Sequence, residues 1–299
     1  MSLEIITPGL LTTVQDAGRF GYAALGMGPS GVMDREAFDR ANRLAGNRGG
    51  NAAVLECTLM GPTLRVDEDT VCAITGADMG AAVRGVPVPR DRAFLLLRGQ
   101  TLIMGAAANG CRAYLAVRGG IDVPAVMGSR ATNMKCRVGG YEGRALKKGD
   151  VLPVGSAAGC EALCVPEQPP VYANDITVRV LPGPQADRLT AKGRSDLYGT
   201  AFTVTADSDR MGIRLDGPAL QNTGTDIISE GLVFGSVQLP SNGKPIILMA
   251  DHQTTGGYAR VASVCTTDLP LLAQLRPGGT VRFREIGEKA AQRLLKNGK

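Results

Sequence analysis

Short apolar runs, separated by glycine- or proline-rich breaks, fill most of the chain and predict a mainly β protein with a few helices. Amphipathic helices do not alternate with these runs, so a parallel sheet built from βαβ units is not expected. The strands predicted in the first half are Leu3–Thr7, Leu10–Val14, Ala52–Cys57, Thr63–Val66, Thr70–Thr75, Phe94–Leu97, Thr101–Ile103 and Ala113–Val117.

One segment of the first half has helical spacing. Asp34 is a suitable N-cap, Phe38, Ala41 and Leu44 form one apolar face, and Gly46 supplies a stop. We expect this helix to pack on a sheet.

The second half repeats the strand-rich pattern. Its predicted strands are Ile176–Leu181, Ala201–Thr205, Ile213–Leu215, Ala259–Val264 and Thr280–Arg284. Helices are expected near Gln185–Leu189, after an N-cap at Asp268, and from Glu288 to Leu295.

A change in composition separates the two halves. Residues 155–174 are rich in Gly, Ala, Ser and Pro, which is typical of a linker. We therefore predict an N-terminal domain over residues 1–155, a linker over 156–174 and a C-terminal domain over 175–299. Two similar phrases, Leu146–Leu152 and Leu275–Val281, leave open whether the halves share one fold.

The stretch from Ser229 to Tyr258 concentrates polar side chains at a strand end. The apolar run Ile246–Ala250 leads directly into Asp251–Thr255, which contains the only histidine of the protein. Side chains at the end of a strand are held on a rigid scaffold and reach solvent. The sequence therefore predicts a functional site here.

Two interpretations of this stretch remain open. His252 can act as a general acid or base near neutral pH, with Asp251 or Glu230 orienting it or acting itself, or it can be structural. Gln238 and Thr254 lie in the same stretch, so the polar set is also suited to polarising a carbonyl group.

The glycine-rich loop Gly26–Gly31 matches G-x-G-x-x-G but lacks the preceding apolar strand of a dinucleotide-binding unit. Its glycines can still bring backbone N–H groups close to an anion or a carbonyl. Arg130 and Arg210, each in a short polar loop, are candidates for binding an anion or are incidental turn residues. A Walker A sequence is absent, so this chain is not expected to bind ATP by that route.

Composition narrows the class of protein. The 33 basic and 28 acidic residues are spread without long runs of one sign, so nucleic acid is not an expected partner. Seven cysteines without a C-x-x-C pair, beside a single histidine, predict reduced thiols in a cytoplasmic protein and no metal site. No export signal or apolar stretch approaching the roughly 20 residues of a membrane span is present.

Phrases along nearly the whole chain resemble the biotin-dependent carboxyltransferase family. This family includes the KipA proteins (allophanate hydrolase subunit 2), the PxpC proteins of 5-oxoprolinase and the carboxyltransferase domain of urea carboxylase. The phrases that carry the resemblance are Thr13–Tyr22, Gly31–Asp34, Ala41–Asn42, Leu55–Glu56, Arg118–Ile121, Gly128–Arg130, Ser229–Gly231, Gln238 with Pro240, and Asp251–Tyr258.

The resemblance implies two cyclophilin-like β-barrel domains. It also implies the C subunit (PxpC) of an ATP-dependent 5-oxoprolinase, which opens 5-oxo-L-proline to L-glutamate with a KipI/PxpB-type and a LamB/YcsF/PxpA-type partner. No cofactor is then expected on this chain alone, because ATP is used by the complex. Two alternatives are a biotin-dependent carboxyltransferase acting on urea or a related amide, and a KipA-like regulator that binds a KipI-type kinase inhibitor.

The resemblance does not assign individual catalytic residues, so the site hypothesis is a chemical one. Proton transfer, carbonyl polarisation, anion binding and the lining of the first-domain face are the roles considered. The predicted catalytic residues are Asp251, His252, Gln253 and Glu230, and the predicted substrate-binding residues are Tyr22, Asp34, Asn42, Glu56, Arg130, Arg210, Gln238 and Thr254.

Overall fold

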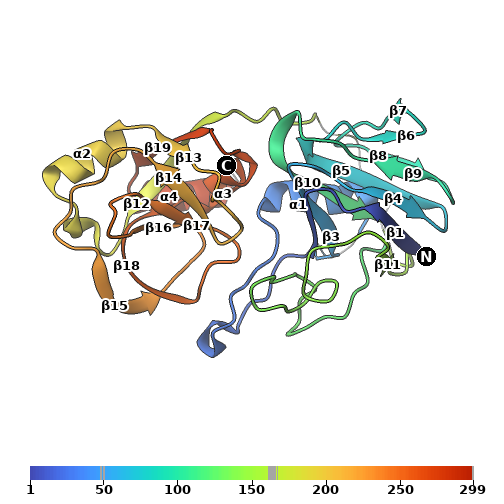
Figure 1. Ribbon diagram of the computed structural model, residues 1–299, viewed down its shortest axis with the longest axis horizontal. Coiled ribbons are helices and arrows are strands. Elements are labelled where there is room, and N and C mark those ends of the chain that lie inside the picture. The colour runs from blue at the N-terminus through green and yellow to red at the C-terminus, as the bar shows by residue number, and fades with distance from the viewer. Residues whose placement is uncertain (48, 50, 161–165, 167, 298–299) are drawn as a thin grey trace. The chain divides into compact units, whose positions relative to one another are not determined.

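The computed structural model describes residues 1–47, 49, 51–160, 166 and 168–297 (Figure 1). Strands hold 37% of the chain and helices 16%, which confirms the mainly β prediction. The strands form one closed seven-stranded barrel and two open sheets.

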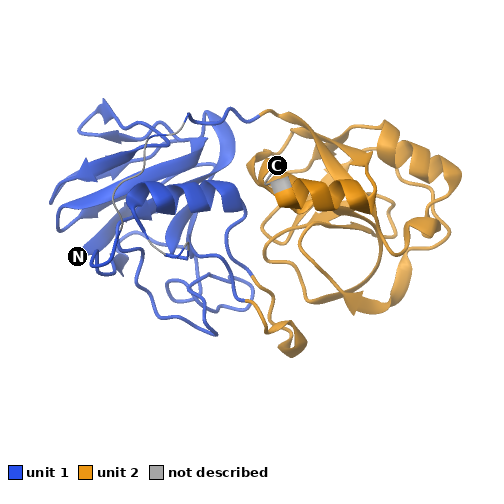
Figure 2. Ribbon diagram, turned by 180° about the vertical axis from the view of Figure 1, so that it is seen from behind, with its two compact units in different colours: residues 1–19, 30–172 blue, residues 20–29, 173–299 orange. Residues whose placement is uncertain are grey.

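The chain divides into two compact units (Figure 2). Unit 1 comprises residues 1–19 and 30–172, and unit 2 comprises residues 20–29 and 173–299. Part of the predicted linker, residues 161–165 and 167, lies outside the described residues. The assignment of residues 20–29 to unit 2 has no counterpart in the sequence pattern.

Unit 1 is built from two antiparallel sheets. The six-stranded sheet has the order β11 (Val151–Pro153), β1 (Ser2–Thr7), β4 (Thr63–Val66), β9 (Thr101–Ile103), β6 (Ala82–Val83) and β7 (Val86–Pro87). The five-stranded sheet has the order β2 (Leu11–Gln15), β3 (Val54–Thr58), β10 (Asn109–Val117), β5 (Thr70–Asp78) and β8 (Ala93–Leu96). Both sheets supply residues to one buried core, among them Leu3 and Leu64 from the first and Leu55 and Leu115 from the second.

Helix α1 (Arg35–Ala45) covers the other face of the five-stranded sheet. Because side chains alternate along a strand, Leu115 of β10 joins the core between the sheets while Tyr114 joins the cluster under α1 with Phe38. The predicted caps are confirmed: the Asp34 carboxylate accepts a hydrogen bond from the Ala37 N–H, and Gly46 ends the helix in a left-handed conformation.

Unit 2 is the closed barrel. Its strands follow the order β12 (Asp175–Pro182), β19 (Thr280–Glu285), β13 (Phe202–Val204), β14 (Gly212–Asp216), β17 (Ile246–Leu248), β16 (Ser236–Leu239) and β18 (Thr255–Val264). Pairing of β12 with β18, for example Val180 opposite Val264, closes the ring. Strand β15 (Asp226–Gly231) pairs with the start of β18 and forms a flap beside the barrel.

The expectation of two barrels therefore holds in unit 2 only. In unit 1 the strands at the sheet edges, β11 and β7 in one sheet and β2 and β8 in the other, each have one partner strand, so both sheets stay open. The strand pattern of the sequence predicts which segments are extended but not whether the first and last strands of a sheet meet.

The helices of unit 2 differ from the sequence-based expectation in two places. Helix α2 (Ala191–Gly199) was not predicted, because only Gly193 and Leu197 are buried and no apolar face marks it. The segment after Cys265 is helical as η4 (Thr266–Asp268) and α3 (Leu269–Gln274), but Asp268 does not cap it. Its carboxylate instead accepts hydrogen bonds from the backbone N–H and guanidinium of Arg179.

The remaining helices are short or terminal. Residues Ala23–Leu25 form the 3₁₀ turn η1, and Ala186–Arg188 form the 3₁₀ turn η3 where a helix was expected. Helix α4 (Glu288–Asn297) confirms the predicted terminal helix.

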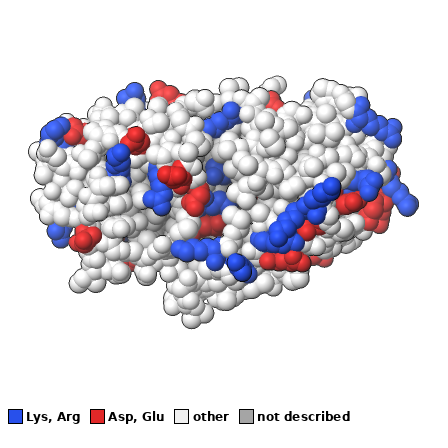
Figure 3. Space-filling view, in the orientation of Figure 1, with Lys and Arg blue, Asp and Glu red and all other residues white. Residues whose placement is uncertain are grey.

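Surface and membrane properties can be stated for the described chain. Figure 3 shows Lys and Arg interspersed with Asp and Glu on the face that it draws. Among the described residues, no helix is both long enough and apolar enough to cross a bilayer. Six of the seven cysteines are free thiols, and Cys164 lies outside the described residues.

Phe202 provides a test of the barrel core. It is fully buried, its ring centroid lies 5.9 Å from that of Phe283, and a Cβ at Gly217 would come within 2.8 Å of its ring. We expect Phe202→Ala to lower the free energy of unfolding of unit 2 by about 3–5 kcal/mol, because the site cannot collapse onto the cavity. Phe20→Ala, at a side chain that is 70% exposed, is the matched control and should change it little. Urea unfolding measures the free energy of unfolding of both variants. Equal losses would contradict the placement of Phe202 in the barrel core.

Candidate functional site

A cavity of about 360 Å³ lies on the outer face of the unit 2 barrel, beside the β15–β18 flap. Strand alternation places it there: Ile213, Ile247 and Val237 are buried in the barrel, so their neighbours face outward. The residues that line it are Asp209, Met211, Gly212, Arg214, Leu232, Gln238, Pro240, Asn242, Ile246, Leu248, Gln253, Gly256, Gly257 and Tyr258.

Two glycines keep this cavity open. A Cβ at Gly256 would lie 2.8 Å from Leu232 Cδ1 and 2.9 Å from Gln238 Nε2, and a Cβ at Gly212 would lie 2.9 Å from Ile246 Cγ2. Real Cβ atoms almost never make contacts this short, so a larger residue at either position would displace the facing side chain of Leu232, Gln238 or Ile246.

The polar groups of the cavity suit a small ligand with an amide and a carboxylate. Gln238 is 6% exposed, and its Nε2 lies 3.5 Å from the Tyr258 carbonyl oxygen, where it donates a weak hydrogen bond. Side-chain amides of Gln238 and Gln253 can donate to a carbonyl and accept from an N–H. Arg214 is exposed and has no ion-pair partner among the described residues, so its guanidinium is available for a carboxylate.

Asp209 lines the cavity and organises the turn beside it. Its Oδ1 accepts hydrogen bonds from the N–H groups of Met211 at 2.8 Å and Gly212 at 3.1 Å. The carboxylate thus holds the turn from which β14 starts.

His252 lies in a tight turn at the end of β17. The turn is closed by a 3.0 Å hydrogen bond from the His252 N–H to the Met249 carbonyl. Nδ1 lies 2.7 Å from the Gln253 carbonyl oxygen, which can only accept, so Nδ1 carries the proton in the neutral ring and Nε2 is the acceptor. Burial lowers the pKa of His252, although the hydrogen bond to Gln253 and the charge of Asp251 oppose this.

Asp251 and Arg210 bind each other. Arg210 Nε donates to Asp251 Oδ2 at 2.9 Å and Nη2 donates to Oδ1 at 3.1 Å, while the Asp251 N–H donates to the Arg210 carbonyl at 2.8 Å. Their side chains are 6% and 4% exposed respectively. The two predicted site residues therefore form a buried bidentate ion pair that joins two loops at one end of the barrel.

Glu230 and Thr254 lie on the flap side of this turn. Glu230 accepts a hydrogen bond from Gln185 Nε2 at 3.1 Å, and its other oxygen lies 3.4 Å from Arg260 Nε. The Thr254 carbonyl accepts from the Leu232 N–H at 2.9 Å. Neither residue lines the cavity, whereas Gln238 and Gln253 do.

In unit 1, Asp34 and Glu56 meet at Tyr114. The Tyr114 hydroxyl accepts from the Asp34 N–H at 2.8 Å and donates to Glu56 Oε2 at 2.9 Å, and the same oxygen accepts from the Met33 N–H. Burial, with the two nearby carboxylates, raises the pKa of Tyr114 well above its ordinary value. This buried network fixes the start of α1.

The remaining predicted site residues of the first half, Asn42, Arg130 and Tyr22, each have different surroundings. Asn42 donates to the Ala52 carbonyl at 2.9 Å near the end of α1. Arg130 donates through its side chain to the Val123 carbonyl and Asp122. Tyr22 is half-buried and belongs to the segment 20–29 of unit 2.

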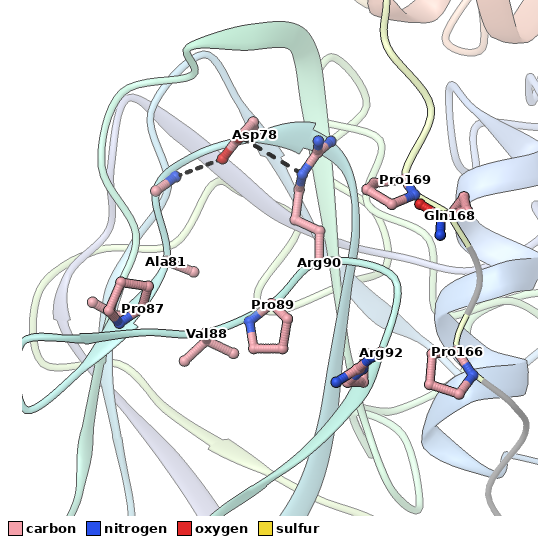
Figure 4. Close-up of a pocket in the computed structure, with 12 residues that line it drawn as sticks. Asp78, Ala81, Pro87, Val88, Pro89, Arg90, Arg92, Pro166, Gln168 and Pro169 are labelled. Atoms are coloured by element: carbon pink, nitrogen blue, oxygen red, sulfur yellow. Dashed lines mark hydrogen bonds and ion pairs between the residues drawn. The ribbon is translucent and has the colours of Figure 1, made fainter.

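Unit 1 holds a larger, open cavity of about 660 Å³ (Figure 4). Prolines supply much of its wall, and Asp78, Arg90 and Arg92 supply its charge. Arg90 is already engaged, because Nη1 donates to the Gly76 carbonyl at 2.7 Å and Nε lies 3.8 Å from Asp78 Oδ2. Fewer convergent polar groups face this cavity than face the one in unit 2.

Sequence reasoning missed Arg214, Asn242, Leu232 and Tyr258 as lining residues. The position of Arg214 could have been predicted from the sequence. It stands between Ile213 and Leu215, whose side chains point inward, so on a strand its own side chain must face outward. The other three reach the cavity through the pairing of β16, β17 and the flap, which the sequence does not reveal.

The comparisons with known proteins agree on one family. Residues 25–285 match the family described as carboxyltransferase domain, subdomain A and B. The chain is 40% identical to the C subunit of 5-oxoprolinase from Escherichia coli, over 94% of this chain and 90% of that protein. It is 34% identical to the C subunit of 5-oxoprolinase from Haemophilus influenzae, over 98% of this chain and 94% of that protein.

A solved structure shares the fold. The crystal structure of the K. lactis urea amidolyase superposes with a TM-score of 0.90 at 31% identity, over 99% of this chain and 19% of that chain. This chain therefore corresponds to about a fifth of that longer protein.

The ion pair predicts a stability defect. Asp251→Asn leaves the Arg210 charge buried without a counter-charge, so we expect a loss of about 3–5 kcal/mol in the free energy of unfolding. Asp207→Asn, at an exposed carboxylate of the same loop region, should change it little. Chemical unfolding measures both. A stable Asp251→Asn protein that is only inactive would contradict the structural role.

The single histidine can be titrated directly. The pKa of His252 in the folded protein is below the usual 6.5, so just below pH 6.5 the unfolded chain binds more protons than the folded one. His252 therefore lowers the free energy of unfolding as the pH drops through that window. NMR of the one imidazole should give a midpoint below 6.5 in the folded protein. A midpoint at or above that value would contradict the burial argument.

Proposed function

The chain belongs to the carboxyltransferase domain family, subdomains A and B, and we propose that it works as the C subunit of an ATP-dependent 5-oxoprolinase that converts 5-oxo-L-proline to L-glutamate. The observation that carries this proposal is the 40% identity to the C subunit of 5-oxoprolinase from Escherichia coli over 90% of that protein. Likeness to urea amidolyase is weaker in sequence and covers a small part of it.

The substrate 5-oxoproline has a carboxylate and a lactam group, and each needs a binding partner on the protein. Its carboxylate binds Arg214, and its lactam carbonyl and N–H meet the amides of Gln238 and Gln253 in the unit 2 cavity. A lactam resists hydrolysis because of amide resonance, so opening it requires a polarised carbonyl and an activated intermediate protected from water. Neutral His252, with Nε2 as acceptor, is the proposed proton acceptor in the neighbouring turn.

The other predicted residues take supporting roles. Asp251 and Arg210 hold the turn, and Glu230 with Thr254 holds the flap. In unit 1, Asp34 and Glu56 fix the start of α1. The finer fold assignment, two cyclophilin-like domains over residues 1–155 and 175–299, remains part of this proposal.

Partners complete the enzyme in this account. We propose a KipI/PxpB-type protein and a LamB/YcsF/PxpA-type protein as the partners, with ATP consumed by the assembled complex. Homology to one component of such a complex supports a role that requires the others. The chain alone is then inactive.

Carboxyl transfer from biotin to urea is the second candidate, favoured by the TM-score of 0.90 to urea amidolyase. It requires carboxybiotin as co-substrate. Binding of free biotin to this chain, together with carboxylation of urea by the chain and a biotin carrier, would replace the leading proposal.

Reconstitution tests the main proposal. The chain mixed with both partner proteins should release glutamate from 5-oxoproline only when ATP is present, and omission of any one protein should abolish turnover. Coupled assays for glutamate and for ADP measure the reaction. A complete, correctly assembled mixture without turnover would overturn the assignment.

Arg214→Gln tests where the substrate binds. Loss of a charge-assisted hydrogen bond of about 1.5–3 kcal/mol should raise the KM for 5-oxoproline roughly ten- to hundredfold in the complex. Arg282→Gln, at an exposed arginine on β19 that does not line the cavity, is the matched control. Equal KM values for the two variants would place the carboxylate elsewhere.

A further inference from the structure

Residues 20–29, here called the strap, connect two points of unit 1 but belong to unit 2. Before the strap, Arg19 donates to the carbonyls of Val126 and Ala131. After it, the Ser30 hydroxyl accepts from Asn133 at 3.0 Å. Hydrogen bonds therefore hold the residue on each side of the strap.

Gly28 is the point at which the strap is seated. Of residues 20–29, Gly28 alone is buried, whereas Phe20 is 70% exposed and Leu25 is 76% exposed. A Cβ at Gly28 would lie 2.8 Å from the backbone carbonyl oxygen of His252. That neighbour is backbone and cannot rotate away, so a larger residue must displace either the strap or the His252 turn.

The same turn is also held by the barrel. Asp251 is fixed by Arg210 through side chain and backbone, and the His252 N–H is bound to Met249. The next residue, Gln253, lines the cavity and accepts the Nδ1 hydrogen bond of His252 through its carbonyl. A shift of the His252 carbonyl would therefore move a side chain of the cavity.

We propose that Gly28 is a positioning residue: through its contact with the His252 carbonyl, the strap fixes the His252–Gln253 turn at the rim of the cavity. Gly28, the second glycine of the Gly26–Gly31 pattern, thereby serves close backbone approach to a carbonyl of the protein itself. The structural claim is independent of the reaction, and only its kinetic consequence rests on the proposed 5-oxoprolinase function.

Gly28→Ala is the direct test, and the single histidine is the reporter. In the full chain, we expect the substitution to shift the His252 imidazole resonances and their titration midpoint. In the reconstituted complex, displacement of Gln253 should raise the KM for 5-oxoproline roughly tenfold with a smaller change in kcat. Gly199→Ala, where an added Cβ has no atom within 4 Å, is the matched control and should alter none of these.

Unchanged His252 resonances together with an unchanged KM in Gly28→Ala would overturn the proposal. If the Gly28→Ala variant fails to fold, a measurement on the wild-type protein decides the case. Glycine- and histidine-selective labelling should show a nuclear Overhauser contact between the Gly28 α-protons and the backbone at residues 252–253. Absence of this contact would overturn the proposal. If the complex does not turn over 5-oxoproline, the proposed function fails while the NMR result still decides the role of Gly28.

Discussion

Arg210 and Asp251 carry opposite charges in a part of the barrel unit that is nearly closed to water, and neither charge is tolerable there alone. Their paired hydrogen bonds join the loop before β14 to the turn after β17. The His252 tautomer and the position of Gln253 follow from the geometry of that turn. The ion pair is thus a condition for the site rather than one of its reactants.

The cavity is a consequence of strand alternation and of missing side chains. Ile213 of β14, Val237 of β16 and Ile247 of β17 point into the barrel, which leaves Arg214 and Gln238 on the outside. Gly212 and Gly256 then supply room that any side chain would fill. A small polar cavity arises on a rigid surface, and the flap places Leu232 and Tyr258 against it.

Local signals in the sequence predicted local structure well. Helix α1 and its Asp34 cap were identified because periodicity and cap chemistry agree over a few residues. Helix α2 was missed because it lacks an apolar face, and Asp268 was assigned as a cap although distant Arg179 captures its carboxylate.

The candidate site was predicted only in part, because local signals in the sequence do not reveal long-range contacts. The stretch Ser229–Tyr258 contains Gln238 and Gln253 of the cavity, but the carboxylate of Asp251 is neutralised by Arg210, forty-one positions earlier in the chain. Such long-range pairings, like the closure of one barrel and not two, depend on which strands meet in space, and a single sequence does not reveal that.

A structure of the assembled complex with 5-oxoproline bound, in the absence of ATP, tests the central claim most directly. The account predicts the ligand in the barrel cavity of unit 2, with its carboxylate on Arg214 and its lactam group within hydrogen-bonding distance of Gln238. Ligand bound elsewhere, for example in the proline-walled cavity of unit 1, with the barrel cavity empty, would contradict it.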